Sequence, residues 1–176
     1  MKLRKRLGAF AISASMLLTM VPALVPSHAA AAGTGSIVLT INSTTMTVNG
    51  TTKNIDENGS KAVLDKGGYT MLPLRGVVEA MGGNLTWDAK TRTITMVKDK
   101  QNVQLTVGST KATVDGTAKA MKASGSAYKA PYLSSAGRTL VHVRALELFT
   151  GTTCAWDQVK QQVTVSYPDN TAPQVP

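Results

Sequence analysis

Two arginines, Arg75 and Arg144, are the side chains best suited to hold a ligand, because each follows a short apolar run at the start of a predicted helix. A guanidinium group binds a carboxylate or a phosphate through two parallel hydrogen bonds. It can also brace the local structure by pairing with a carboxylate such as Asp88 or Asp157. We favour the bracing role and keep both arginines as candidate ligand-binding residues.

Three tyrosines offer a second kind of binding surface. Tyr69, Tyr128 and Tyr132 lie near the starts of predicted strands, where an aromatic ring could stack on a sugar. Such rings commonly complete a core or a sheet edge in a chain that has few aromatic residues. Packing is therefore the favoured interpretation, with Tyr69 and Tyr132 kept as candidate ligand-binding residues.

Catalytic groups are scarce in the sequence. Cys154 is the only cysteine, and its position on a predicted strand is typical of a small buried side chain. His142 stands alone and cannot build a metal site by itself. Asp88 and Asp157 each follow a tryptophan at the start of a predicted turn, where a carboxylate accepts backbone N–H bonds. We therefore predict no enzyme activity, no catalytic residue, no cofactor and no metal site.

These residues sit in a repeated segment. Residues 62–96 align without a gap on residues 131–165, at a constant offset of 69. A repeat of this length is usually one supersecondary unit used twice. The identical pairs are Leu64/Leu133, Gly68/Gly137, Thr70/Thr139, Arg75/Arg144, Gly82/Gly151, Trp87/Trp156, Asp88/Asp157 and Thr95/Thr164.

Each repeat begins with predicted strands and tight turns. Alternating apolar residues at 103–107 are typical of a half-buried strand, and residues 36–42 precede the first repeat in the same way. Asn49-Gly50 and Asp115-Gly116 predict two-residue hairpin turns, whose central positions both need a positive φ.

A helix and a closing hairpin follow in each repeat. In the first, Leu74, Val77, Val78 and Met81 fall on one helix face after Pro73. The second repeat is less regular, which predicts a rotated or shorter helix. The closing strands are predicted at 84–88 and 93–97, and again at 153–157 and 162–165. Structural roles are predicted for Gly82 and Gly151 as helix ends, for Trp87 and Trp156 as core residues, with Trp87 beside Val77 and Met81, and for Asp88 and Asp157 as turn residues.

The pattern predicts an α+β fold of two tandem small units, each an antiparallel sheet of about five strands wrapped around one short helix. The units span residues 36–98 and 102–167, with a polar joint between them and two lobes sharing an interface as the favoured arrangement. Residues 168–176 are predicted to be a disordered tail.

The first 32 residues resemble a signal peptide. Lys2, Arg4, Lys5 and Arg6 precede an uncharged apolar run from Leu7 to Val25, and small residues follow up to Ala32. An uncleaved membrane anchor is the alternative. Cleavage predicts a secreted or cell-wall-associated protein with no membrane attachment.

The charge of the chain fits such a location. The sequence carries a net charge of +9, of which four positive charges lie in the predicted signal peptide, so the mature chain is at +5. This charge favours anionic wall polymers as partners. The lysines are dispersed and no arginine stripe alternates with aromatic residues, which argues against nucleic acid.

The motifs 72–75, 79–83 and 87–88, with their counterparts in the second repeat, resemble the copper amine oxidase N-terminal-like, or stalk, domain in two tandem copies over about residues 36–167. The resemblance implies a five-stranded antiparallel sheet around one helix, in exported or wall-associated proteins of spore-forming Gram-positive bacteria. It does not imply copper chemistry, because the oxidase needs several histidine ligands and a cofactor-forming tyrosine. The second repeat departs from the pattern at His142, which replaces Pro73, and at Leu148, which replaces Glu79.

The sequence thus predicts an exported non-catalytic binding or spacer module, associated with the cell wall or surface. Its partner would be an anionic wall polymer or another exported protein. The alternative is a protein–protein interaction module, for dimerisation or inhibition, that acts through its open sheet edges.

Overall fold

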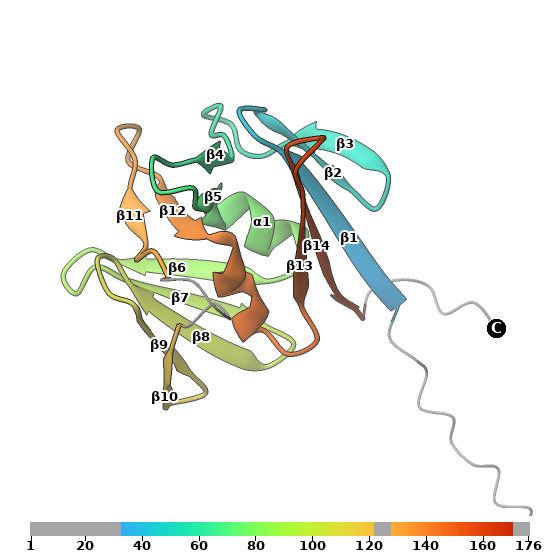
Figure 1. The fold of residues 1–176 in the computed structure, drawn as a ribbon. Coiled ribbons are helices and arrows are strands. Elements are labelled where there is room, and N and C mark those ends of the chain that lie inside the picture. Colours follow the sequence, from blue (N-terminus) through green and yellow to red (C-terminus); the bar gives the residue numbers. More distant parts are fainter. Residues whose placement is uncertain (1–32, 122–127, 171–176) are drawn as a thin grey trace, which may run out of the picture.

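A computed structural model describes residues 33–121 and 128–170, and most of them lie in three antiparallel sheets (Figure 1). The predicted signal peptide lies outside the described residues. The first sheet has the order β13 (Thr153–Asp157), β14 (Gln162–Asp169), β1 (Gly33–Thr40), β2 (Thr45–Val48) and β3 (Thr51–Asn54). The second has the order β10 (Thr117–Ala120), β9 (Lys111–Val114), β8 (Gln101–Thr106), β7 (Thr93–Lys98) and β6 (Asn84–Asp88). The central sheet has the order β11 (Tyr132–Leu133), β12 (Thr139–His142), β5 (Thr70–Pro73) and β4 (Val63–Leu64).

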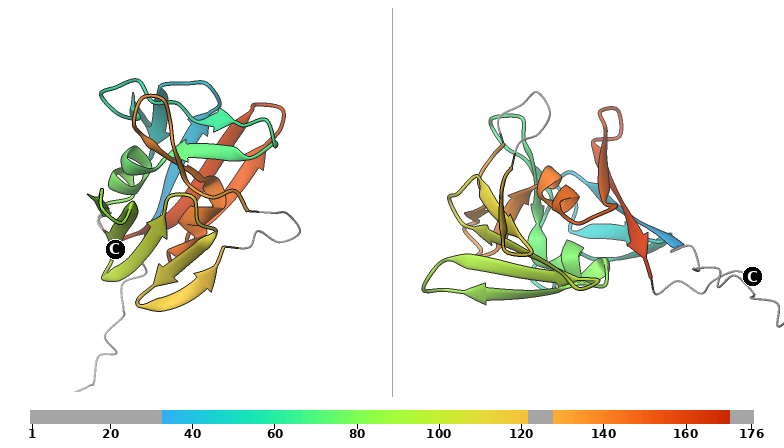
Figure 2. Two further views of the ribbon diagram at one scale, coloured as in Figure 1. Left: turned by 90° about the vertical axis from the view of Figure 1, so that its left-hand side faces the viewer. Right: turned by 90° about the horizontal axis from the view of Figure 1, so that it is seen from below.

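Every sheet contains strands from both repeats, which corrects the expectation that each repeat builds its own sheet. In the first sheet, β1 of the first repeat pairs with β14 of the second. In the second sheet, β7 pairs with β8. In the central sheet, β5 pairs with β12. The two five-stranded sheets lie on different sides of the molecule (Figure 2).

The predicted polar joint between the repeats is a hairpin turn. Asp99 and Lys100 have φ values of 50° and 69°, the backbone that a two-residue turn requires at both positions. They connect β7 directly to β8, and six residue pairs follow from Lys98↔Gln101 to Thr93↔Thr106. Because a tight turn holds both strands in one sheet, no spacer separates the repeats.

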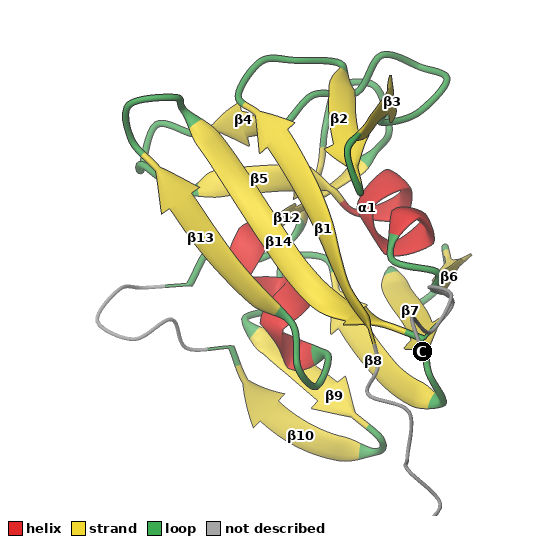
Figure 3. Cartoon of the chain, turned by 90° about the vertical axis from the view of Figure 1, so that its right-hand side faces the viewer, coloured by secondary structure: helices red, strands yellow, loops and turns green. Residues whose placement is uncertain are grey.

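The two ends of the described chain are joined in the first sheet. Strands β1 and β14 pair over their full length, from Gly33↔Asp169 to Thr40↔Gln162, and lie side by side in Figure 3. The predicted start of the tail at residue 168 is wrong, since Pro168 and Asp169 belong to β14. Residues 171–176 lie outside the described part of the chain.

The two helical segments differ in type. In the first repeat, α1 (Leu74–Ala80) is an α-helix preceded by Pro73 with φ −65°. Its counterpart, η1 (Val143–Leu148), is a 3₁₀ helix, the tighter form that is used in short pieces. The second helix was predicted to be rotated or shorter, and it differs from the first by being a 3₁₀ helix of six residues where α1 has seven.

One core connects the three sheets and both helical segments. Its members include Leu39, Val77, Ile94, Leu105 and Val165, and each is at most 1% exposed. The alternation of buried and exposed residues along β1, β7 and β8 turns one face of each sheet inward.

The two tryptophans are not core residues, which corrects their predicted role. Trp87 and Trp156 are each 38% exposed. They lie on β6 and β13, the outermost strands of the two five-stranded sheets, so no further strand covers them. The predicted helix residues Val77 and Met81 are buried. None of the described helices has the length and apolar character needed to cross a membrane.

Gly76 on α1 tests how tightly the helix packs. A Cβ atom at this position would lie 2.0 Å from the carbonyl oxygen of Ile55. We expect Gly76→Ala to lower the free energy of unfolding by about 2 kcal/mol, because the backbone must move to admit the methyl group. Urea denaturation monitored by circular dichroism measures this change.

The control for this prediction is Ala145→Gly, since Ala145 is the counterpart of Gly76 and already accommodates a buried methyl group. This variant should also be destabilised, by about 1–2 kcal/mol, because it loses helix propensity and one buried methyl group, so a methyl group that fits is stabilising at this position. Equal stability of Gly76→Ala and the parent protein would show that α1 does not pack rigidly against Ile55.

Candidate functional site

A pocket of about 220 Å³ lies where the two repeats meet. The start of α1 and strands β5, β6 and β7 form one side, and the β11–β12 turn of the second repeat forms the other. Its lining residues are Asp56, Pro73, Leu74, Arg75, Gly76, Leu85, Trp87, Ile94, Leu133, Gly137, Arg138 and Thr139.

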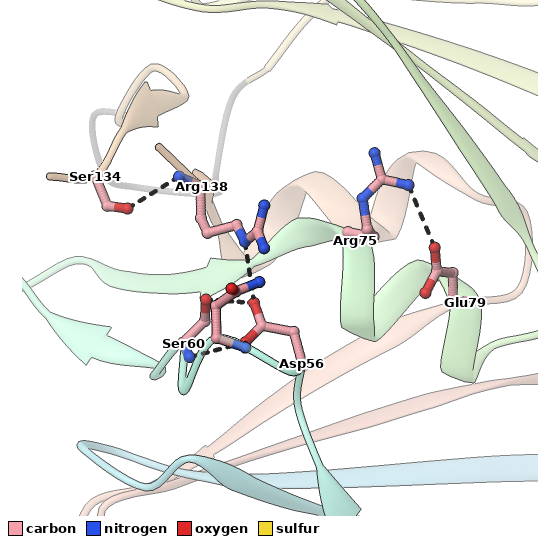
Figure 4. Close-up of polar contacts among 7 residues, drawn as sticks. Asp56, Ser60, Arg75, Glu79, Ser134 and Arg138 are labelled. Carbon is pink, nitrogen blue, oxygen red and sulfur yellow. Dashed lines mark hydrogen bonds and ion pairs between the residues drawn. The ribbon is translucent and has the colours of Figure 1, made fainter. Parts of the chain in front are cut away.

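Arg138 enters the pocket from the turn between β11 and β12. The turn is held by hydrogen bonds from the Gly137 N–H to the Ser134 carbonyl (2.9 Å) and from the Arg138 N–H to the Ser134 Oγ (3.2 Å). Gly137 has φ +70°, which favours glycine at this corner. The Arg138 side chain reaches across to Asp56, with its Nε 3.4 Å from Asp56 Oδ2 (Figure 4).

Asp56 is fixed in place by its own loop. Its carboxylate accepts hydrogen bonds from the N–H groups of Asn58 and Ser60, both at 2.9 Å, and from the Ser60 hydroxyl. Partial burial acts to raise the pKa of Asp56, but the Ser60 and Asn58 hydrogen bonds and the Arg138 charge outweigh it and lower that pKa. Asp56 is therefore a fixed negative charge that orients Arg138.

Arg75 projects from the first turn of α1 on the same side (Figure 4). Its Nη1 lies 3.4 Å from Glu79 Oε1 and 3.5 Å from the Leu85 carbonyl oxygen, and its side chain is 50% exposed. These contacts are long and solvent-exposed, so they hold the guanidinium weakly. The expected carboxylate partner is thus Glu79 rather than Asp88.

The rest of the pocket is apolar. Leu74, Leu85 and Ile94 are buried at its base, while Trp87 and Leu133 are exposed large hydrophobic residues. Two guanidinium groups, one carboxylate, an indole ring and an aliphatic base together suit a ligand with a negative charge and an apolar or ring-shaped face.

In the opposite half, aromatic rings stand where Arg138 and Pro73 stand in the pocket, and a second cavity of about 220 Å³ lies beside Arg144 and Tyr128. At the offset of 69, Tyr69 corresponds to Arg138, and His142 corresponds to Pro73. The His142 ring contacts Tyr69 and Tyr128 edge to face, with centroid distances of 5.6 Å and 5.0 Å. Tyr69, a predicted ligand residue, is therefore a packing partner of His142.

Arg144 has a different environment from Arg75. Its Nη1 donates to Glu147 Oε1 at 2.7 Å, and the same oxygen accepts the Cys154 N–H at 3.1 Å. A 3₁₀ helix has three residues per turn and places residues i and i+3 on one face, whereas α1 brings Arg75 to Glu79 at i+4. The second repeat thus keeps an Arg–Glu pair although Leu148 replaces Glu79.

The Cys154 thiol and the His142 ring are both sequestered. Burial raises the pKa of Cys154 to about 12, and the nearby Glu147 adds to this effect. The thiol lies 3.5 Å from the Val143 carbonyl oxygen, to which it donates. The Nδ1 atom of His142 is buried without a hydrogen-bond partner among the described residues. Neither group has the environment of a nucleophile or base.

The remaining predicted residues lie away from the pocket. Tyr132 stacks near Lys129, whose Nζ is 5.7 Å from the ring centroid and which pairs with Asp65. Asp88 accepts backbone N–H bonds from Lys90 (2.9 Å) and Thr91 (3.4 Å), and Asp157 accepts them from Val159 and Lys160 (both 3.0 Å). Gly82 and Gly151 have φ values of 79° and 77° just after the two helical segments.

Sequence reasoning missed Arg138 and Asp56. Both lie outside the set of residues that recur in the two repeats, because Arg138 aligns with Tyr69 and Asp56 precedes the aligned block. The available signal was the difference between the two aligned positions, since Arg138 in the second repeat is charged and Tyr69 in the first is aromatic. Within residues 33–121 and 128–170, no group of three or more His, Cys, Asp or Glu side chains could hold a metal ion.

His142 should make the stability of the protein depend on pH. Burial, with a smaller effect from the Arg144 charge, lowers the pKa of His142 below 6.5, against the opposing effects of Asp65 and Glu147. The unfolded chain then binds a proton more readily, so the free energy of unfolding falls as the pH drops from about 6.5 toward the folded-state pKa. The slope is at most about 1.4 kcal/mol per pH unit.

Urea midpoints at pH 7.5, 6.5 and 5.5 measure this slope, and His142→Phe should remove it while keeping an aromatic ring between Tyr69 and Tyr128. The carboxylates of Asp56 and Asp65, where the effect of burial is outweighed by hydrogen bonds that lower the pKa values, serve as the internal control because both proteins share them. An unchanged slope in the variant would contradict the assignment to His142.

Comparison with known protein families supports the family that the motifs resemble, over one segment rather than two tandem copies. Residues 58–129 match the copper amine oxidase N-terminal domain family. No curated protein matched the sequence. The matched segment contains α1 and all five strands of the second sheet, so it crosses the β7–β8 turn where the repeats were expected to separate. Over this segment the chain is therefore similar to the copper amine oxidase N-terminal domain, which is a non-catalytic stalk domain.

Proposed function

We propose that this chain is an exported, non-catalytic binding module that attaches to an anionic polymer of the cell wall. The observation that carries the proposal is the pocket at the junction of the repeats. It places Arg75 of the first repeat and Arg138 of the second around one apolar base. Because the two guanidinium groups come from different repeats, the site forms only when both repeats fold together.

Two further features support a binding role. The matched family segment is a non-catalytic stalk domain, which accounts for a scaffold that is rich in packing and turn residues. The net charge of +5 expected after removal of the signal peptide favours approach to a polyanion. The pocket then supplies a local site in addition to this general attraction.

The alternative, binding through open sheet edges, has less support at two of the four edges of the five-stranded sheets. The edge strands β3 and β10 are exposed along their whole length, and they carry Lys53 and Lys119 respectively. Lysine on an outer strand opposes pairing with another strand. These two edges are therefore poorly suited to strand-mediated dimerisation.

Sedimentation of the purified protein with isolated cell walls tests the proposal. We expect retention at moderate salt and at least about a hundredfold weaker interaction for the double variant Arg75→Ala/Arg138→Ala, since hydrogen bonds to charged groups contribute roughly 1.5–3 kcal/mol each.

The matched control is Arg144→Ala/Lys53→Ala, which removes the same charge outside the pocket between the repeats. It should be retained nearly as well as the parent protein. If both double variants lost the same amount of wall retention, the interaction would depend on net charge and not on the pocket. If the parent protein were not retained, wall binding would be refuted.

A further inference from the structure

We infer that the pocket between Arg75 and Arg138 accepts a sugar ring that carries one carboxylate, with the guanidinium groups holding the carboxylate and Trp87 lying against the ring. This inference rests on the proposed function, because it specifies the unit of the anionic polymer that the module would hold. Three observations support it: the charge of the pocket, the exposure of Trp87 with its indole N–H, and the comparison with the opposite half.

The charge of the pocket matches a monoanion. Arg75, Arg138 and Asp56 are its charged lining residues, which gives a net charge of +1. Arg138 directs its Nε toward Asp56, so the two terminal nitrogens of its guanidinium group are left to donate to a ligand. Arg75 is held only by contacts of 3.4 Å and 3.5 Å. A carboxylate can therefore enter without breaking a strong ion pair.

Trp87 provides the ring-binding surface. Its side chain is 38% exposed while lining the pocket above the buried residues Leu85 and Ile94. Its counterpart Trp156, with the same exposure, donates its indole N–H to Gln158 at 2.7 Å. Ala89 stands at the position of Gln158 in the first repeat and has no acceptor side chain. The Trp87 indole N–H thus remains available to a hydroxyl group of the sugar.

The opposite half explains why one site rather than two is expected. There Tyr69 stands in the place of Arg138, and its ring packs against His142 together with Tyr128. The cavity of this half therefore lacks a counterpart of the Arg138 guanidinium, and its own cation, Arg144, is paired with Glu147 at 2.7 Å. Arg138 is the residue that distinguishes the binding half of the scaffold from its counterpart, and we expect one ligand per chain.

Titration with three defined probes tests the inference: an oligomer of galacturonic acid, a neutral galactose oligomer, and a glycerol phosphate polymer. The first has both a ring and a carboxylate, the second lacks the charge, and the third carries phosphate charges without a ring. Calorimetry should give one site per chain for the acidic sugar and at least about tenfold weaker binding for the other two probes.

A direct readout comes from tryptophan emission in the Trp156→Phe variant, in which Trp87 is the remaining tryptophan. The acidic sugar should change the Trp87 emission. Arg138→Gln and Trp87→Ala should each weaken binding by about tenfold, whereas Arg144→Gln and Trp156→Ala should leave it unchanged. Unfolding midpoints confirm that each variant is folded, and the Arg138 and Trp87 variants test the site independently.

The outcomes separate this inference from the proposed function. Wall retention together with tight glycerol phosphate binding that ignores Trp87 would overturn the sugar assignment and leave wall binding standing. Wall retention without binding of any probe would also overturn the assignment. Failure of both wall retention and probe binding would overturn the two proposals together.

Discussion

The pairing of β1 with β14 is the contact on which the rest of the structure depends. It joins the first described strand to the last along eight residue pairs and converts two separate groups of strands into one five-stranded sheet. Ile37 and Leu39 on β1 and Val163 and Val165 on β14 all contribute to the core and are at most 1% exposed. Without this pairing, the apolar faces on both sides would lose their partner and a large part of the core would meet water.

The local elements of this fold were predictable from the sequence, but the partners of the strands were not. Asn49-Gly50 marks its turn because both residues take positive φ, at 48° and 83°. The Asp99-Lys100 turn has the same backbone without a glycine, so it resembled a polar joint. Alternation of apolar residues identifies the buried face of a strand and says nothing about which strand lies beside it. The interleaving of the repeats therefore emerges only in three dimensions.

Only some of the pocket residues were predictable, because the repeat drew attention to residues that recur and away from those that differ. Arg75 recurs as Arg144, and the repeat drew attention to both. Arg138 was hidden because the repeat aligns it with Tyr69, and Trp87 was predicted to be a core residue beside Val77 and Met81. Its position on an outermost strand turns the same ring into the wall of a pocket. The two halves share a scaffold and differ at a few residues. One half has Arg138 in the pocket, and the other has Tyr69 at the matching position.

The joined ends of the chain also constrain the order of folding. A ribosome delivers β1 before β14, so the first sheet cannot be completed until β14 has emerged. Closing a loop of this length costs entropy before the new contacts can repay it, and such non-local pairing is slow. The second sheet comes from one continuous stretch of sequence and can form earlier. A chain whose last described strand pairs with its first therefore keeps the first sheet open until the second repeat has been synthesised.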